Sequence, residues 1–240
     1  MSDRAGEQST GGSAGPPAPR GAGPATLPSL TAQAERLVEL GVVGDGAGPL
    51  SVAELREVVA RLEPRASAGA LLVASDRVKP PSALVPRLLR VVEGRDPKAG
   101  FVVVDMADVD GFAPTSTTTV PEELVYAIED PDRGDAMRNW SPAEAEASLL
   151  RRGRTPFTIG EGVHWALQAP EVVDRNACYM MIGSRLRTQR GYDARTPALW
   201  ISNGTGRDGR ERRGAPKLGW CWWNNRHTWL GFASGARRVA

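Results

Sequence analysis

Residues 218–232 read LGWCWWNNRHTWLGF, two short runs of strand-forming side chains on either side of a pair of asparagines. The runs Leu218 to Trp223 and Thr228 to Phe232 are rich in aromatic and aliphatic residues, which favour a pleated, half-buried strand. Asn224 and Asn225 tolerate the left-handed backbone that a tight turn requires. This stretch therefore predicts an antiparallel hairpin.

Two more β-prone runs lie upstream of this hairpin, at Cys178 to Ile182 and Ala198 to Ser202. With the hairpin they predict an antiparallel sheet over residues 176–238. Five of the seven tryptophans fall in the final 41 residues, namely Trp200, Trp220, Trp222, Trp223 and Trp229. We therefore expect a Trp-rich antiparallel sheet at the C-terminus.

The chain before this sheet mixes strand and helix patterns. Leucines at helical spacing over residues 82–92 predict a helix, which Pro86 should kink or shorten. Three apolar runs predict strands, at Ala70 to Ala74, Phe101 to Val104 and Leu124 to Ile128. The first two of these strands, with the helix between them, suggest a crossover unit whose neighbouring strands run parallel.

Helix starts are marked by capping boxes, in which Ser or Thr is followed three positions later by Glu. The three boxes are Ser51 with Glu54, Ser141 with Glu144, and Thr158 with Glu161. Residues 1–30 are mostly small or polar and predict a disordered tail. We expect a single α+β domain over residues 31–240, with a helical hairpin at 31–64, a mixed α/β part at 70–175 and the sheet at 176–238. Most helices should then lie in its first two-thirds.

Composition excludes some classes of protein. The 240 residues are 41% apolar and 24% charged, with no apolar run long enough to cross a membrane. The formal charge of +2 gives no field that would attract nucleic acid by itself. Two cysteines and no secretory signal predict reduced thiols and a cytoplasmic location. Because 27 of the 30 basic residues are arginine, the gene resembles one from a GC-rich bacterial genome.

The clustered tryptophans allow three interpretations. They could be the large core side chains of a small sheet, or a stacking wall for a planar or sugar-like ligand. They could also stack on single-stranded nucleic acid, with the charged Arg207 to Arg213 loop beside them. The near-neutral charge makes the third interpretation the weakest.

Cys221 and His227 are candidate catalytic residues, because a nucleophilic thiol needs a base and histidine is the usual one. A two-residue turn at 224–225 would put them on opposite faces of the hairpin, whereas a three-residue turn through Arg226 would make them diagonal neighbours. The alternative is a buried, inert cysteine.

Further candidate ligand-binding residues are Arg185, Ser184, Trp200, Trp220, Trp222, Trp229 and Glu161. Arg185 and Ser184 follow a predicted strand, where a guanidinium and backbone N–H groups can hold a carboxylate or phosphate. A zinc site of Cys178, Cys221 and His227, with Glu161 or Asp174 as the fourth ligand, lacks the short ligand spacings that such sites usually show. We predict no metal and no cofactor. His164 is expected to be a satisfied helix histidine.

An ordered series of motifs resembles one actinobacterial family, catalogued as domain of unknown function 5701. The motifs are RTPFTIGEG (154–162), GSR (183–185), PALWIS (197–202), APKLGWCW (215–222) and HTWLG (227–231). The resemblance spans about residues 70–238 and implies no activity or catalytic residue. Against the family pattern, Asn203 to Gly214 form an insertion, and Trp223 and Arg226 replace a smaller residue and a proline. These departures suggest an altered ligand preference.

The leading hypothesis is a cytoplasmic protein that binds a small polar or aromatic molecule at the Trp-rich C-terminal sheet. Bacterial specialised metabolism is one setting for such a protein. If it also transforms the molecule, a Cys/His-dependent hydrolase or transferase is the predicted class. The alternative is a non-catalytic interaction module or homo-oligomer, whose tail, helical hairpin and arginine loop dock a protein partner. A single-stranded nucleic-acid binder is the third hypothesis.

Overall fold

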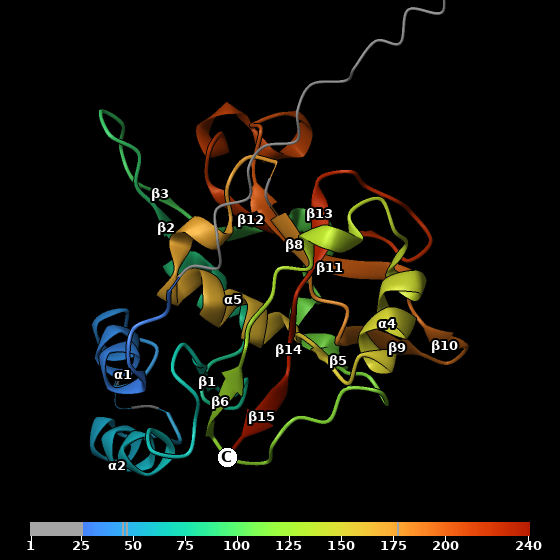
Figure 1. Ribbon diagram of the computed structural model, residues 1–240. Helices are drawn as coiled ribbons and strands as arrows, with labels where there is room; N and C mark the ends of the chain where they lie inside the picture. Colours follow the sequence, from blue (N-terminus) through green and yellow to red (C-terminus); the bar gives the residue numbers. More distant parts are fainter. Residues whose placement is uncertain (1–25, 45, 47, 177) are drawn as a thin grey trace, which may run out of the picture.

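A computed structural model of the protein describes residues 26–44, 46, 48–176 and 178–240 (Figure 1). Most of the predicted tail, residues 1–25, lies outside the described residues. The packed chain begins slightly earlier than expected, because Leu27 and Leu30 are both buried in the main core. The described chain forms a single α+β domain, as the sequence predicted.

Two N-terminal helices pack side by side at one edge of the molecule (Figure 1). Helix α1 spans Leu30–Glu39 and helix α2 spans Val52–Leu62, which begins at the predicted capping box of Ser51. Buried Gln33 donates a hydrogen bond to the Ala70 carbonyl and accepts one from the Leu72 N–H, each at 2.8 Å. These bonds hold α1 against the strand that follows α2.

That strand, β1 (Leu71–Ala74), belongs to a three-stranded antiparallel sheet with β6 (Val125–Glu129) in the centre and β15 (Arg237–Val239) at the other edge. The predicted crossover unit is therefore wrong, since β1 pairs with β6 and β4 (Phe101–Val102) joins another sheet. The helix between β1 and β4 is too short to carry the chain back to the starting end of β1, as a parallel neighbour would require. Helix α3 (Pro81–Leu84) ends in the 3₁₀ turn η1 (Val85–Arg87), which contains Pro86.

The main sheet has five strands in the order β13-β8-β11-β12-β4. The strands are β8 (Cys178–Met180), β11 (Arg195–Ile201), β12 (Pro216–Trp222) and β13 (Leu230–Phe232), with β4 at the edge. The central strands β8, β11 and β12 are antiparallel as expected, but β13 runs parallel to β8 and β4 runs parallel to β12. The sheet is therefore mixed.

The predicted 218–232 hairpin does not form, because β13 pairs with β8 instead of β12. The loop 223–229 carries the chain past β11 and β8 to the far edge of the sheet. It is fixed at both ends, since Trp223 N–H donates to the Ala194 carbonyl at 2.8 Å and the Asn139 N–H donates to the His227 carbonyl at 2.9 Å. Both turn registers considered for Cys221 and His227 are thereby overturned.

Shorter strands complete the architecture. They are β5 (Phe112–Pro114), β9 (Ser184–Thr188) and β10 (Gly191–Tyr192) in one sheet, β7 (Thr155–Pro156) with β14 (Ser234–Gly235), and β2 (Leu89–Arg90) with β3 (Lys98–Ala99). The remaining 3₁₀ turns are η2 (Val104–Met106), η3 (Val109–Gly111), η4 (Asp135–Met137), η5 (Pro170–Val172), η6 (Gly206–Asp208) and η7 (Arg210–Arg212). The β2–β3 pair forms an arm that projects from the body (Figure 1).

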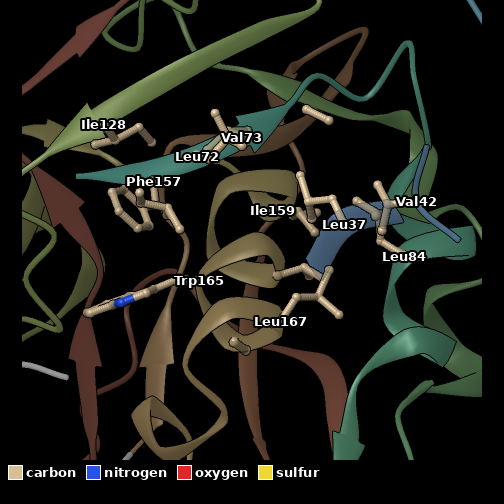
Figure 2. Close-up of a cluster of buried hydrophobic side chains, with 14 of the residues drawn as sticks. Leu37, Val42, Leu72, Val73, Leu84, Ile128, Phe157, Ile159, Trp165 and Leu167 are labelled. Carbon is tan, nitrogen blue, oxygen red and sulfur yellow. The ribbon is translucent and has the colours of Figure 1, made fainter. Parts of the chain in front are cut away.

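Helix α5 (Ile159–Gln168) is buried along its whole length. It lies between the β1-β6-β15 sheet, called here the small sheet, and the main sheet (Figure 1). Figure 2 shows Ile159, Trp165 and Leu167 of this helix among side chains from α1, β1 and β6. Gly162 permits the close approach, because a side chain there would overlap Met181. Among the described residues, no helix has the length and apolar character needed to cross a membrane.

A smaller group of buried side chains, called here the second cluster, occupies the other face of the main sheet. Helix α4 (Pro142–Arg151) and turn η4 contribute to it. Its members are Met137, Ala145, Leu149, Cys178, Met180, Ile182, Ala198, Leu230 and Phe232, with Trp200, Cys221, Trp223 and Trp229 packed around it. The tryptophans Trp200, Trp223 and Trp229 therefore pack around the second cluster and not around the main core.

Candidate functional site

Strand alternation divides the C-terminal tryptophans between the two faces of the main sheet. Trp200 and Cys221 lie on the face of the second cluster, and Trp200 meets Trp229 edge to face with ring centroids 6.2 Å apart. Trp220 instead packs against the main core, and its ring centroid lies 4.5 Å from that of Trp222. Trp222 is 49% exposed. Of the tryptophans predicted to form a stacking wall, the structure brings Trp200 and Trp229 together and leaves Trp222 at the surface.

A cavity of about 420 Å³ lies beside the second cluster. Strands β8, β11 and β12 and the approach to β13 supply its walls. The lining residues are Trp200, Trp220, Trp229, Ile201, Cys178 and Cys221, together with the polar Arg175, Asn176 and Asn203. The pocket is partly open to solvent and has polar as well as aromatic lining, and its volume lies in the usual range of small-molecule sites.

The Cys221 thiol lines this cavity but is not activated by its surroundings. Burial raises the pKa of Cys221 to about 11, and the nearby Lys217 ammonium only partly opposes this effect. Burial also lowers the pKa of His227, whose ring lies 5.5 Å from Trp229. Within the described parts of the chain, no hydrogen bond joins Cys221 to His227. Both side chains are therefore neutral at pH 7, and the thiol is protonated.

The residues of the alternative zinc site do not converge. Nowhere in the described chain do three or more Cys, His, Asp or Glu side chains gather closely enough to hold a metal ion. The Cys178 thiol donates to the Asp174 carbonyl at 3.3 Å, and the Asp174 carboxylate pairs with Arg90 at 3.0 Å.

Ser184 and Glu161 lie at the first turn of α5, away from the second cluster. The Ser184 hydroxyl accepts a hydrogen bond from the Ile159 N–H at 3.1 Å. Fully buried Glu161 completes the capping box with Thr158 and forms an ion pair with Arg238 at 2.6 Å. Both polar groups have partners inside the main core and therefore a structural role. For Glu161 the capping box predicted part of this role, whereas the position of Ser184 after a strand did not reveal it.

Arg185 follows Ser184 on β9 but packs toward the loop 223–229. Its guanidinium lies 3.9 Å from the ring centroid of Trp223 and 5.4 Å from that of Tyr192. Trp223 packs against the second cluster, so Arg185 lies next to that cluster through Trp223, while the lining of the cavity does not include Arg185.

Residues 203–214, which we expect to be an insertion, are mostly exposed, and Asp208 anchors them to the sheet. Asp208 is buried, accepts from the Ser202 hydroxyl at 2.8 Å and pairs with Lys217 at 2.7 Å. The Lys217 ammonium in turn lies 5.0 Å from the ring centroid of Trp200. Residues 203–214 therefore contact, through Asp208 and Lys217, the tryptophan that borders the cavity.

Asp76 is a candidate functional residue that the sequence analysis missed. Asp76 is exposed as a residue, but its carboxyl group lies against buried Gly160, so close that a side chain at position 160 would overlap it. Burial of the carboxyl, reinforced by the charges of Glu161 and Asp110, raises the pKa of Asp76 to about 7. Its only sequence signal was an acid two residues after a buried strand.

Comparison with known proteins identifies the family of the chain but no activity. No curated protein and no solved structure matches it. The model of a family described as being of unknown function, DUF5701, matches residues 36–240, which include all the motifs that suggested this resemblance. The protein is therefore a member of the DUF5701 family.

Proposed function

We propose that the protein binds a small polar or aromatic molecule in the cavity beside the second cluster. The observation that carries this proposal is the cavity itself, about 420 Å³ in volume and bordered by Trp200 and Trp229. A ligand there would gain stacking and burial against the indoles, while Arg175, Asn176 and Asn203 could orient its polar groups.

The proposal extends to chemistry at Cys221. In that version His227 takes the thiol proton while the Cys221 sulfur adds to an acyl carbon of the ligand and the carbonyl π electrons move to its oxygen. When these electrons return, the bond to the leaving group breaks and that group takes the proton from His227. Water or an acceptor then cleaves the thioester, as in a Cys/His-dependent hydrolase or transferase. Because burial raises the pKa of Cys221 to about 11, a bound ligand would first have to favour the thiolate. Binding without reaction is the simpler function, and it needs no such change.

The cellular setting is also part of the proposal. The free thiol of Cys221 is consistent with a reducing cytoplasm. The excess of arginine over lysine is consistent with a GC-rich bacterium, and specialised metabolism would offer suitable aromatic ligands.

A panel of small aromatic and sugar-like compounds, ranked by thermal shift and then measured by calorimetry, tests the binding proposal. Trp229→Ala and Asn203→Ala remove two parts of the cavity lining, of which exposed Asn203 is the less disruptive to packing. Trp140→Ala is the matched control, since Trp140 is 37% exposed and does not line the cavity.

We expect the dissociation constant of the best compound to rise about tenfold or more in Trp229→Ala, through lost stacking and burial, and to stay unchanged in Trp140→Ala. If no compound binds, or if both cavity variants bind like the wild type, the proposal is wrong.

Docking of a protein partner is a second candidate function, favoured by the β2–β3 arm. Leu89 and Val91 on this arm are 49% and 68% exposed. Substitution of both by serine should abolish self-association in sedimentation experiments if the partner is a second copy of the chain. A wild-type monomer at high concentration would exclude that partner.

A further inference from the structure

Arg185 is a buried cation with almost no protein partner. The residue is 6% exposed, and its guanidinium stacks against Trp223 at 3.9 Å. Of its five N–H donors, one makes a hydrogen bond in the part of the chain that the structure describes, from Nη2 to the Asp193 carbonyl at 2.5 Å. Its Nε is buried with no partner among these residues. A buried charge with so few partners is costly to the fold.

Arg238 provides a comparison inside the same molecule. Its side chain is also buried, yet every nitrogen of its guanidinium donates to a protein acceptor. Those acceptors are the two Glu161 carboxylate oxygens, the Thr119 and Pro156 carbonyls and the Thr155 hydroxyl. Arg238 is thus fully satisfied by the protein, and Arg185 is not. Arg138 also has a buried Nε without a partner among the described residues, but its Nη2 pairs with the Asp135 carboxylate at 3.1 Å.

The acids closest to Arg185 are engaged elsewhere. The Asp193 carboxylate binds Arg195 at 3.1 Å, and Glu146 accepts from the Thr117 hydroxyl at 2.9 Å. Burial lowers the pKa of Arg185, and the charges of Glu146 and Asp193 only partly oppose this effect. Within the described residues, no carboxylate forms an ion pair with Arg185.

Two other buried polar atoms beside the second cluster also have no partner among the described residues. Thr196 Oγ1 lies on β11 at the position paired with Cys221, and His227 Nε2 belongs to the ring beside Trp229. Unsatisfied buried groups are rare in folded proteins, and each one calls for an explanation. Thr196 and His227 each lie next to a residue that borders the second cluster, as Arg185 does through Trp223.

We propose that Arg185 receives the anionic oxygen group, a carboxylate or phosphate, of a ligand whose apolar body contacts the tryptophans of the second cluster. Guanidinium groups bind such anions through paired, charge-assisted hydrogen bonds. Trp223 and Tyr192 hold the guanidinium in place by stacking, which reduces the entropy lost on binding. This inference rests on the proposed function and names the chemical class of its ligand.

The test compares benzoate and inorganic phosphate with benzamide, the neutral counterpart of benzoate, at constant ionic strength in chloride. Affinity is measured by calorimetry in every protein. In proteins that keep Arg185, contact with the anion is also followed by the nuclear magnetic resonance signal of the Arg185 Nε–H, identified by its absence from Arg185→Lys. Arg185→Gln removes the charge. Arg187→Gln is the matched control, because Arg187 lies on the same strand, 5.2 Å from the Tyr192 ring centroid, but is exposed.

We expect both anions to shift the Nε–H signal in the wild type and in Arg187→Gln. Arg185→Gln should weaken benzoate binding about tenfold or more. Equal affinity for benzoate and benzamide, or wild-type anion binding by Arg185→Gln, would overturn the inference and leave the cavity proposal intact. If Arg185→Gln does not fold, an Nε–H signal that neither anion moves in the wild type overturns it. Binding of none of the three probes would count against both proposals.

Discussion

His164 has no exposed surface, and both of its ring nitrogens have partners in the main core. Nδ1 lies 2.8 Å from the Gly160 carbonyl and therefore carries the proton, which leaves Nε2 to accept a hydrogen bond from the Ala74 N–H at 3.3 Å. A second proton would have to bind Nε2, which would break its hydrogen bond with the Ala74 N–H. The fold therefore requires a neutral imidazole. This confirms His164 as a satisfied helix histidine.

The pH dependence of stability should reveal this requirement. Burial lowers the pKa of His164 from 6.5 to about 4, so its contribution is complete above pH 6.5 and is lost as the pH falls toward 4. The loss amounts to about 3 kcal/mol. Urea unfolding between pH 7 and 4 should show a shallower pH dependence in His164→Gln than in the wild type or His227→Gln. Parallel curves for all three proteins would contradict this assignment.

Asp76 should act in the opposite direction. Because its folded pKa is raised from 3.8 to about 7, the folded protein holds a proton there that the unfolded chain releases, and stability falls as the pH rises from 4 to 7. Asp76→Asn should therefore melt at a higher temperature than the wild type at pH 8, with little difference at pH 4. Exposed Asp96 is the control, and Asp96→Asn should show no such gain. An Asp76→Asn protein that is less stable at pH 8 would refute the repulsion from Glu161 and Asp110.

Thiol reactivity separates the two roles proposed for Cys221. With a pKa of about 11, the thiol should react with iodoacetamide far more slowly at pH 7.5 than a free cysteine, measured in a Cys178→Ala background. The rate should rise toward pH 11 and should not depend on His227. A rate that is high at pH 7.5 and is lost in His227→Ala would instead establish an activated nucleophile.

At the scale of elements, all three predicted capping boxes are present, at Ser51, Ser141 and Thr158. The first two are exposed, so water can replace the serine hydroxyl when it is removed. Thr158 is buried, and its hydroxyl accepts from the Glu161 N–H at 3.3 Å inside the core. The same motif therefore has different energetic weight in different helices.

Alanine substitutions should measure this difference. Ser51→Ala and Ser141→Ala should each reduce the free energy of unfolding by about 1 kcal/mol. Thr158→Ala should cost about 2 kcal/mol or more, because it leaves a buried N–H unpaired. Urea denaturation of the three variants makes the comparison, and equal losses would show that burial does not change the value of the cap.

Local signals were sufficient to predict where elements begin, but not which strands pair. Capping boxes fixed the starts of α2, α4 and α5, and apolar runs located β1, β6 and β8. The choice of β8 as the partner of β13 depends on the hydrogen bonds that Trp223 and His227 make with distant residues, which no local pattern contains. The same limit applies to the site, since Glu161 was identifiable as a cap but its pairing with Arg238 depends on the tertiary fold.

At the scale of the whole molecule, the pair of Arg238 and Glu161 connects the small sheet to the central helix. Arg238 lies on β15, Glu161 lies in the first turn of α5, and both side chains are almost inaccessible to solvent. Loss of one partner would leave the other charge buried and unpaired. The pair therefore controls whether the small sheet remains packed against the rest of the domain.

Arg238→Met should reduce the free energy of unfolding by about 3–5 kcal/mol, the usual cost of breaking a buried ion pair from one side. The double variant Arg238→Met with Glu161→Gln should recover part of this loss, because no uncompensated charge remains. Calorimetric melting of the single and the double variant measures how much stability is recovered. A double variant no more stable than Arg238→Met would show that the hydrogen bonds, and not the charge, dominate.

The partners of the edge strands have a consequence for how the chain folds. Strand β12 pairs with β4, and β15 pairs with β6, so each contact closes a loop of about a hundred residues. Topologies rich in such distant contacts fold slowly. During synthesis, β4 and β6 must wait with unpaired edges until their partners leave the ribosome. In that interval the nascent chain is at its greatest risk of aggregation and its greatest need of a chaperone.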